Sequence, residues 1–180
     1  FGDGLPDWRD AWAGVVDGGE GERPWYVTAK AAEGAHATIL GVSVHSDGTW
    51  RALSVGDCCL FHVRETAVRE TWPMDEPEAF DHRPSLVVSR RDASAPTPDA
   101  IDGLWKPGDA FLLATDALSA WLMRRGDEKA GGTAWLDLEQ DVFRERITEA
   151  RDRGDLRNDD ATLLVLGIDG PGTDGESGTG

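Results

Sequence analysis

The chain has 180 residues, enough for one domain with a substantial hydrophobic core. It carries 34 acidic against 18 basic residues, a net charge of −16, which disfavours nucleic acid and anionic membranes as partners. No apolar run approaches the ~18 residues that a membrane span needs, and no signal peptide is visible. The adjacent cysteines Cys58 and Cys59 are poorly placed to pair with each other, which favours free thiols in a reducing cytoplasm.

The first third of the chain predicts a short helix followed by strands. Residues 1–22 are rich in Gly and Asp, with Trp8 and Trp12 at helical spacing, and predict a leading segment with one short helix. From Ala37 the pattern changes, and strands are predicted over 38–44, 49–55 and 59–64. Their connections are predicted to be the turns Ser46-Asp47-Gly48 and Gly56-Asp57.

The middle of the chain predicts a loop and then a strand followed by a helix. Residues 89–103 contain prolines and little apolar content, so a long surface loop is predicted there. The apolar run 111–115 predicts a buried strand. Leu118, Trp121 and Leu122 follow at spacings of three and four residues, which predicts a helix directly after Asp116.

The last third predicts a longer helix, a final strand and a tail. Apolar residues recur at helical spacing at Trp135, Leu138, Val142 and Ile147. A last strand is predicted over 163–168, and the Gly-rich residues 169–180 predict a flexible tail after a domain that spans 1–168. Strands in hairpins mixed with two helices predict an α+β domain with antiparallel sheets rather than an alternating βαβ fold.

Three aspartates, Asp57, Asp116 and Asp159, each lie where an apolar run meets a turn. Asp116 ends the run 111–114, and Asp159 precedes the run 162–168. If these two runs are antiparallel neighbours, the two carboxylates lie at the same edge of the sheet. They would repel one another unless a cation lies between them, and an oxygen-only site suits Mg²⁺ or Mn²⁺ rather than zinc. The sequence therefore predicts a divalent metal site.

Four short motifs resemble those of a known family. Gly-Ala-His-Ala-Thr at 34–38, Val-Gly-Asp-Cys at 55–58, Leu-Ala-Thr-Asp-Ala at 113–117 and Asn-Asp-Asp-Ala-Thr at 158–162 follow one another in this order. They are similar to the Gly-Ser-Thr-Ala, Gly-Asp-Ser, Ser-Asp-Gly and Asp-Asn-x-Thr motifs of the type 2C metal-dependent Ser/Thr protein phosphatases. Pro24-Trp25-Tyr26 and Arg83-Pro84 resemble a bacterial branch of that family.

The resemblance implies a fold and an activity. The fold would be an antiparallel β-sandwich flanked by helices in α-β-β-α layers, with a metal cluster at one end. Two or more Mg²⁺ or Mn²⁺ ions would activate a water that hydrolyses phosphoserine or phosphothreonine in a phosphorylated protein substrate. The chain would then be a hydrolase of bacterial signalling. A hydrolase of small phosphoesters would carry the same motifs.

The resemblance also implies roles for single residues. By motif position, Asp116 and Asp159 would be metal ligands, and Asp57 would help to hold a further metal. Asp160 would support the ligands or cap a turn. Arg83 would bind phosphate beside the metals through a bidentate guanidinium.

The chain also departs from the family pattern. Cys58 stands where the family has Ser, and Ala117 stands where it has Gly. The family's N-terminal Asp-Gly motif follows a strand, which Asp3-Gly4 lacks, so we expect the true motif and the first strands upstream of Phe1. A fragment without that carboxylate would bind metal weakly. These departures leave an alternative, a catalytically degenerate regulatory or binding module on the same fold.

Overall fold

The computed structural model describes residues 34–80, 84–90, 94–125, 135 and 138–169. The strands in chain order are β1 (His36–Ala37), β2 (Ile39–Val44), β3 (Thr49–Val55), β4 (Cys59–Arg64), β5 (Ala67–Trp72), β6 (Val87–Val88), β7 (Asp99–Leu104), β8 (Asp109–Ala114) and β9 (Leu163–Gly167). The helices are η1, a 3₁₀-helix (Pro77–Ala79), α3 (Asp116–Arg124) and α6 (Gln140–Asp152). The predicted leading segment and tail lie outside the described residues, and the division at residue 168 stays a prediction.

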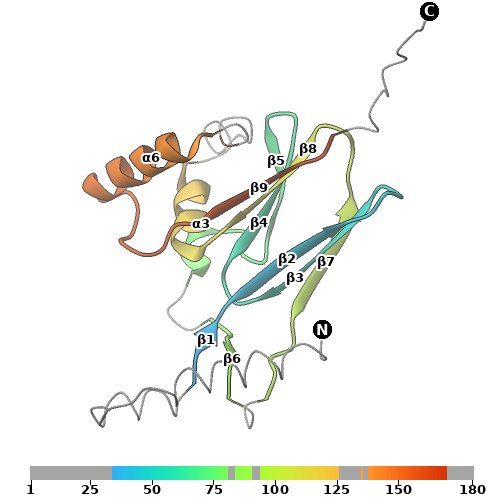
Figure 1. Cartoon of the computed structure of the whole chain (residues 1–180), viewed down its shortest axis with the longest axis horizontal. Coiled ribbons are helices and arrows are strands. Elements are labelled where there is room, and N and C mark those ends of the chain that lie inside the picture. Colours follow the sequence, from blue (N-terminus) through green and yellow to red (C-terminus); the bar gives the residue numbers. More distant parts are fainter. Residues whose placement is uncertain (1–33, 81–83, 91–93, 126–134, 136–137, 170–180) are drawn as a thin grey trace, which may run out of the picture.

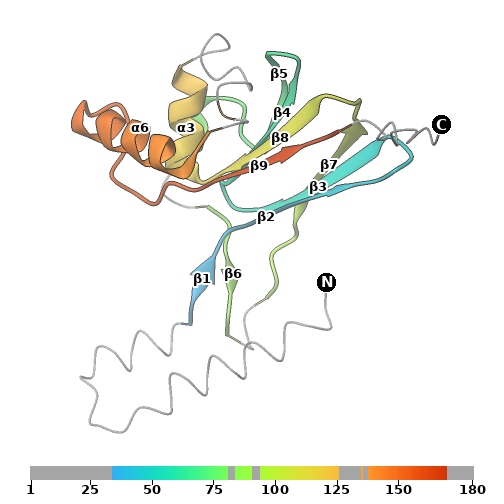
Figure 2. The ribbon, with the colours of Figure 1, turned by 45° about the horizontal axis from the view of Figure 1, so that its top comes forward.

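Two antiparallel sheets form a sandwich with helices on one side. One sheet has the strand order β2-β3-β7 and the other β5-β4-β8-β9, while β1 and β6 form a small separate pair. Figures 1 and 2 show α3 and α6 on the outer side of the four-stranded sheet, with the three-stranded sheet on its other side. The predicted α+β fold with antiparallel sheets is confirmed.

The four-stranded sheet packs apolar side chains on both of its faces. On β8, Phe111 joins Trp50 and Leu60 between the two sheets, whereas Leu112 joins Leu118 against the helices. Successive residues of a strand point to opposite faces, so a strand buried on both sides needs an unbroken apolar run. This burial explains why 111–114 contains no polar residue.

Most predicted strands are confirmed, with small shifts at their ends. The strands at 49–55 and 59–64 match β3 and β4, and the strand predicted over 111–115 corresponds to β8, which begins at Asp109 and ends at Ala114. Strands β8 and β9 are antiparallel neighbours, with Ala114 opposite Leu163. The condition on which the metal-site prediction depended is therefore met.

Gly56-Asp57 was predicted to be the turn between the strands at 49–55 and 59–64, and its composition is that of a hairpin turn. The structure instead gives a crossover between sheets, because β3 pairs with β2 and β7 whereas β4 pairs with β5 and β8. Local composition favours a tight turn but does not specify which strands pair across it. The crossover carries Asp57 from one sheet of the sandwich to the other.

The long loop predicted over 89–103 is wrong in its last third, where β7 pairs with β3. Strand β7 has one face in the sandwich and one exposed, and the inward positions are Ile101 and Gly103. Gly103 leaves room for the indole of Trp50, since a Cβ there would lie 2.7 Å from its Nε1. With Ile101 as the only apolar side chain on its inward face and Leu104 exposed, β7 gives too weak an alternation to be recognised.

Two further elements differ from the prediction. Strand β5 was not predicted, because it is an edge strand rich in charged residues. Helix α6 begins at Gln140 rather than near Trp135. Trp135 is buried separately, and the centre of its ring lies 5.8 Å from that of Trp121 in an edge-on arrangement.

In the part of the chain that the structure describes, no helix is both long and apolar enough to cross a membrane.

Gly56→Ala is expected to lower the free energy of unfolding by about 3 kcal/mol, through backbone strain and a steric clash. Gly56 has φ +110°, and an added Cβ would lie 2.4 Å from Cγ2 of Thr38. The matched control is Gly48→Ala, at φ +88° with open space around the added Cβ, and about 1 kcal/mol is expected there. Urea unfolding of both variants measures the difference, and equal losses would contradict the clash.

Candidate metal centre

Thr115 ties the loop before β9 to the end of β8. Its N–H donates to the carbonyl of Thr162 at 3.2 Å, and its hydroxyl donates to the carbonyl of Asp160 at 3.0 Å. The N–H of Thr162 in turn donates to the Thr115 hydroxyl oxygen at 3.1 Å. Thr115 is the N-cap residue of α3 but makes no side-chain cap hydrogen bond. Its hydroxyl is used instead to hold together the segments that carry Asp116 and Asp159.

Asp116 and Asp159 share one cation. Asp116 is the first residue of α3, where a negative charge is favoured by the helix dipole. Nη2 of Arg157 donates to Oδ2 of Asp159 at 2.9 Å and also to Oδ2 of Asp116. All three side chains are partly exposed, at 26% for Asp116, 50% for Asp159 and 44% for Arg157. The two predicted ligands therefore face one another across a guanidinium group.

The carboxylate of Asp159 is held in its ionised form. The N–H of Asp160 donates to Oδ1 of Asp159 at 2.9 Å, and this bond lowers the pKa of the Asp159 carboxyl below its usual value. Desolvation opposes this shift, and the charge of Arg157 adds to it. Arg151 donates to the main-chain carbonyl of Asp159. An ionised carboxylate at neutral pH is the form that binds a hard divalent cation.

Asp57 lies at the same end of the sandwich as Asp116, because Cys59 pairs with Ala114, although the residue is only 7% exposed. Both residues act electrostatically on the thiol of Cys58. Burial raises the pKa of the Cys58 thiol, the hydrogen bond with Thr38 opposes that rise, and the charges of Asp57 and Asp116 add to it. A thiol with a raised pKa is a poor nucleophile. All four motifs thus meet at one end of the sandwich.

The remaining predicted site residues have mixed outcomes. Asp160 contributes through its main chain, with its N–H on Asp159 and its carbonyl on Thr115. A ligand-supporting or capping role for its side chain stays a prediction. Arg83 lies outside the described residues, as does Asp3-Gly4. Ala117 is the second residue of α3 and has no positive φ, so alanine causes no strain there.

The donor set fits Mg²⁺ or Mn²⁺ in chemistry and in number. Among the described residues there is no group of three or more His, Cys, Asp or Glu side chains arranged to hold a metal ion. The pair Asp116 and Asp159 offers carboxylate oxygens that already converge on a positive charge. Mg²⁺ is commonly held in proteins by one or two carboxylates, with water and substrate phosphate completing the shell. Two carboxylates at an open edge match that mode of binding.

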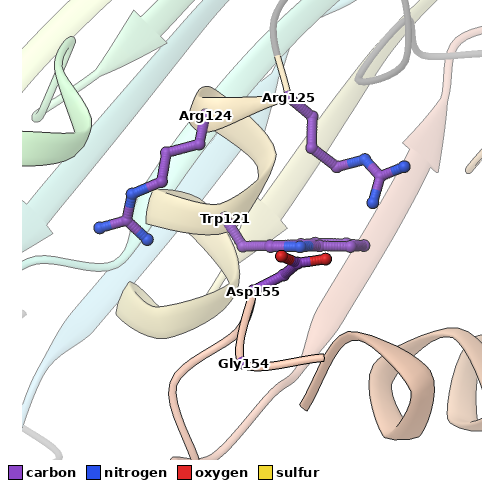
Figure 3. A pocket seen from close by; sticks show the side chains of 5 residues that line it. All are labelled: Trp121, Arg124, Arg125, Gly154 and Asp155. Carbon is purple, nitrogen blue, oxygen red and sulfur yellow. The ribbon is translucent and has the colours of Figure 1, made fainter. Parts of the chain in front are cut away.

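A separate hollow of about 640 Å³ lies at the other end of α3 (Figure 3). It is lined by Trp121, Arg124, Arg125, Gly154 and Asp155. The guanidinium carbon of Arg125 lies 4.7 Å from the centre of the Trp121 ring, while Arg124 leaves the helix on another side. Asp116 and Arg124 are eight residues apart, or ~12 Å along the helix axis. The hollow is therefore not part of the carboxylate edge.

The fold is that of the type 2C Ser/Thr phosphatases, as the motif order predicted. Neither a protein-family model nor a curated protein sequence matches the chain, but solved structures do. They include a serine/threonine phosphatase of Mycobacterium tuberculosis, PstP/Ppp, with a TM-score of 0.53 at 13% identity over 94% of this chain and 85% of that one.

Two further solved structures have the same likeness. The serine/threonine phosphatase of S. agalactiae has a TM-score of 0.53 at 18% identity over 74% of this chain. The chain spans 60% of that protein. The photosystem II phosphatase PBCP has a TM-score of 0.50 at 17% identity over 91% of this chain and 76% of that one. At these identities the likeness establishes the fold.

Proposed function

We propose that the chain is the phosphatase domain of a metal-dependent enzyme that hydrolyses phosphoserine and phosphothreonine in proteins. The observation that carries the proposal is the meeting of Asp116 and Asp159 around one positive charge at the end of β8 and the start of β9. The order of the four motifs and the likeness in fold to serine/threonine phosphatases support it. The proposal extends to a bacterial signalling role in the cytoplasm. The free thiols of Cys58 and Cys59 support the location, because thiols stay reduced in the cytoplasm.

Asp116 and Asp159 would hold Mg²⁺ or Mn²⁺, and Asp57 would help to hold a further ion. Divalent cations bound there would activate a water molecule and offset the charge of the transferred phosphoryl group. The chain's own residues prepare the site, because the hydrogen bonds of Thr115 and Asp160 fix the distance between the two ligands. The partly exposed carboxylates leave the edge open to a phosphorylated loop of a protein.

The charge of the whole chain makes a cation necessary at this edge. A net charge of −16 repels a phosphate group at long range. Arg151 and Arg157 are the cationic side chains that contact the Asp159 loop. Metal ions would add the remaining positive charge where the phosphate has to bind.

The test is phosphate release by the natural full-length protein. With Mn²⁺, release from a phosphothreonine peptide is expected, and it should stop when EDTA removes the metal and return when Mn²⁺ is restored. Faster turnover of p-nitrophenyl phosphate than of any phosphopeptide would identify a small-phosphoester hydrolase instead. No release from either substrate would contradict the proposal and leave the alternative of a regulatory or binding module.

A further inference from the structure

Arg157 projects from a rigid stretch of main chain. The N–H groups of Asp155 and Leu156 both donate to the carbonyl of Ala150 at the end of α6, and Leu156 is only 3% exposed. On the other side, the N–H of Asp159 donates to the carbonyl of Arg157 at 2.9 Å. The main chain is therefore held on both sides, whereas the side chain is 44% exposed. The long, partly exposed side chain of Arg157 therefore has more freedom to change position than its main chain.

The contacts of Arg157 differ from those of a structural ion pair. Arg64 offers a comparison within the same chain, because it donates from Nε and Nη2 to a carboxylate of Asp109 that is 0% exposed. Arg157 uses Nη2 alone, and both of its carboxylate partners are partly exposed. Exposed ion pairs of this kind contribute little to folding stability. Stability alone is thus a weak reason for a cation at this position.

The guanidinium of Arg157 and a divalent cation would compete for the same oxygens. Oδ2 of Asp116 and Oδ2 of Asp159 both face Nη2, while Oδ1 of Asp159 is engaged by the N–H of Asp160. A metal that takes the two Oδ2 atoms repels a guanidinium at the same place. Once displaced, the guanidinium stays beside the site, since hydrogen bonds hold its main chain on both sides. Its planar fork matches the oxygens of a phosphate group.

We propose that Arg157 is a phosphate-binding residue of the carboxylate edge, held by Asp116 and Asp159 until a divalent cation replaces it. The inference rests on the proposed function and adds a phosphate ligand to it. It predicts that Arg157 opposes metal binding and favours phosphate binding. A purely structural clamp would do neither, because its loss would loosen the loop and weaken the metal site.

The test is calorimetric titration of the natural full-length protein with Mn²⁺ alone, then of the Mn²⁺-loaded protein with inorganic phosphate. Arg157→Gln is expected to bind Mn²⁺ about fivefold more tightly than wild type, since one competing charge is gone. Its affinity for phosphate is expected to fall about tenfold. The matched control is Arg153→Gln, which removes the same charge from an exposed pair with Glu149 and Asp155. Both affinities of this control should stay within about twofold of wild type.

Each other outcome overturns the inference in a recognisable way. Weaker or unchanged Mn²⁺ binding by Arg157→Gln would make Arg157 a structural clamp, and unchanged phosphate affinity would remove its role as a ligand. Circular dichroism of both variants establishes that they are folded. If wild type binds Mn²⁺ and releases phosphate from peptides while Arg157→Gln behaves like wild type, only this inference fails. If wild type binds no Mn²⁺, the proposed function fails with it.

Discussion

Asp116→Asn is expected to weaken Mn²⁺ binding by the natural full-length protein by at least about a hundredfold, and to abolish Mn²⁺-dependent phosphate release. Even residues that merely support metal ligands cost ten- to a hundredfold in affinity when replaced, and a ligand should cost more. Asparagine keeps the size of the side chain and removes its charge. Calorimetric titration with Mn²⁺ measures the change, with about two bound ions expected for wild type from the resemblance.

Asp141→Asn is the matched control for that experiment. Asp141 lies in the first turn of α6 as Asp116 does in α3, and its side chain is 94% exposed beside Arg144. The substitution changes the net charge and the charge at a helix N-terminus in the same way, so its Mn²⁺ affinity should match wild type. Equal Mn²⁺ affinity of wild type and Asp116→Asn would mean that the metal site is not at this edge.

Asp109→Ala is expected to lower the free energy of unfolding by about 3–5 kcal/mol, because it leaves Arg64 and the buried His62 without the carboxylate that accepts their hydrogen bonds. Asp109 begins β8 at the end opposite Asp116 and is 1% exposed. Its carboxylate accepts from Arg64 at 2.7 Å twice, from Nε2 of His62 at 2.8 Å and from the N–H of Lys106 at 2.8 Å. Urea unfolding measures the loss, and Asp102→Ala on the exposed face of β7 serves as the control.

The same carboxylate predicts how stability depends on pH. Burial alone raises the pKa of the Asp109 carboxyl, but the hydrogen bonds from Arg64 and His62 outweigh it, and the pKa lies well below its usual range. A group with a lowered folded-state pKa contributes its full stability above its unfolded value of about 3.9 and loses it as the pH falls further. The advantage of wild type over Asp109→Ala should therefore narrow below about pH 4. A difference in stability between wild type and Asp109→Ala that stays constant down to pH 2 would contradict the lowered pKa of the Asp109 carboxyl.

The sequence by itself determined the elements whose residues carry a strong pattern. The unbroken apolar run at 111–114 predicted β8, because only a strand buried on both faces needs one. The spacing of Leu118, Trp121 and Leu122 predicted α3, whose buried face they form. The positions of Asp116 and Asp159 at the ends of two such runs predict that they meet if the runs are antiparallel neighbours, and the register of β8 with β9 meets that condition.

Only the tertiary structure decided which strands pair and which charges meet. Which strands pair on either side of Gly56-Asp57 depends on packing between the sheets, and the residues of the turn do not indicate those partners. Strand β7 forms because it pairs with β3 and because Gly103 leaves space for the indole of Trp50. Its own alternation of apolar and polar residues is too weak to predict it. Arg157 with Asp116, and Arg64 with Asp109, are 41 and 45 residues apart in the chain. Charged residues have no periodicity that indicates their partners, so such ion pairs become visible only when the sheets are in place.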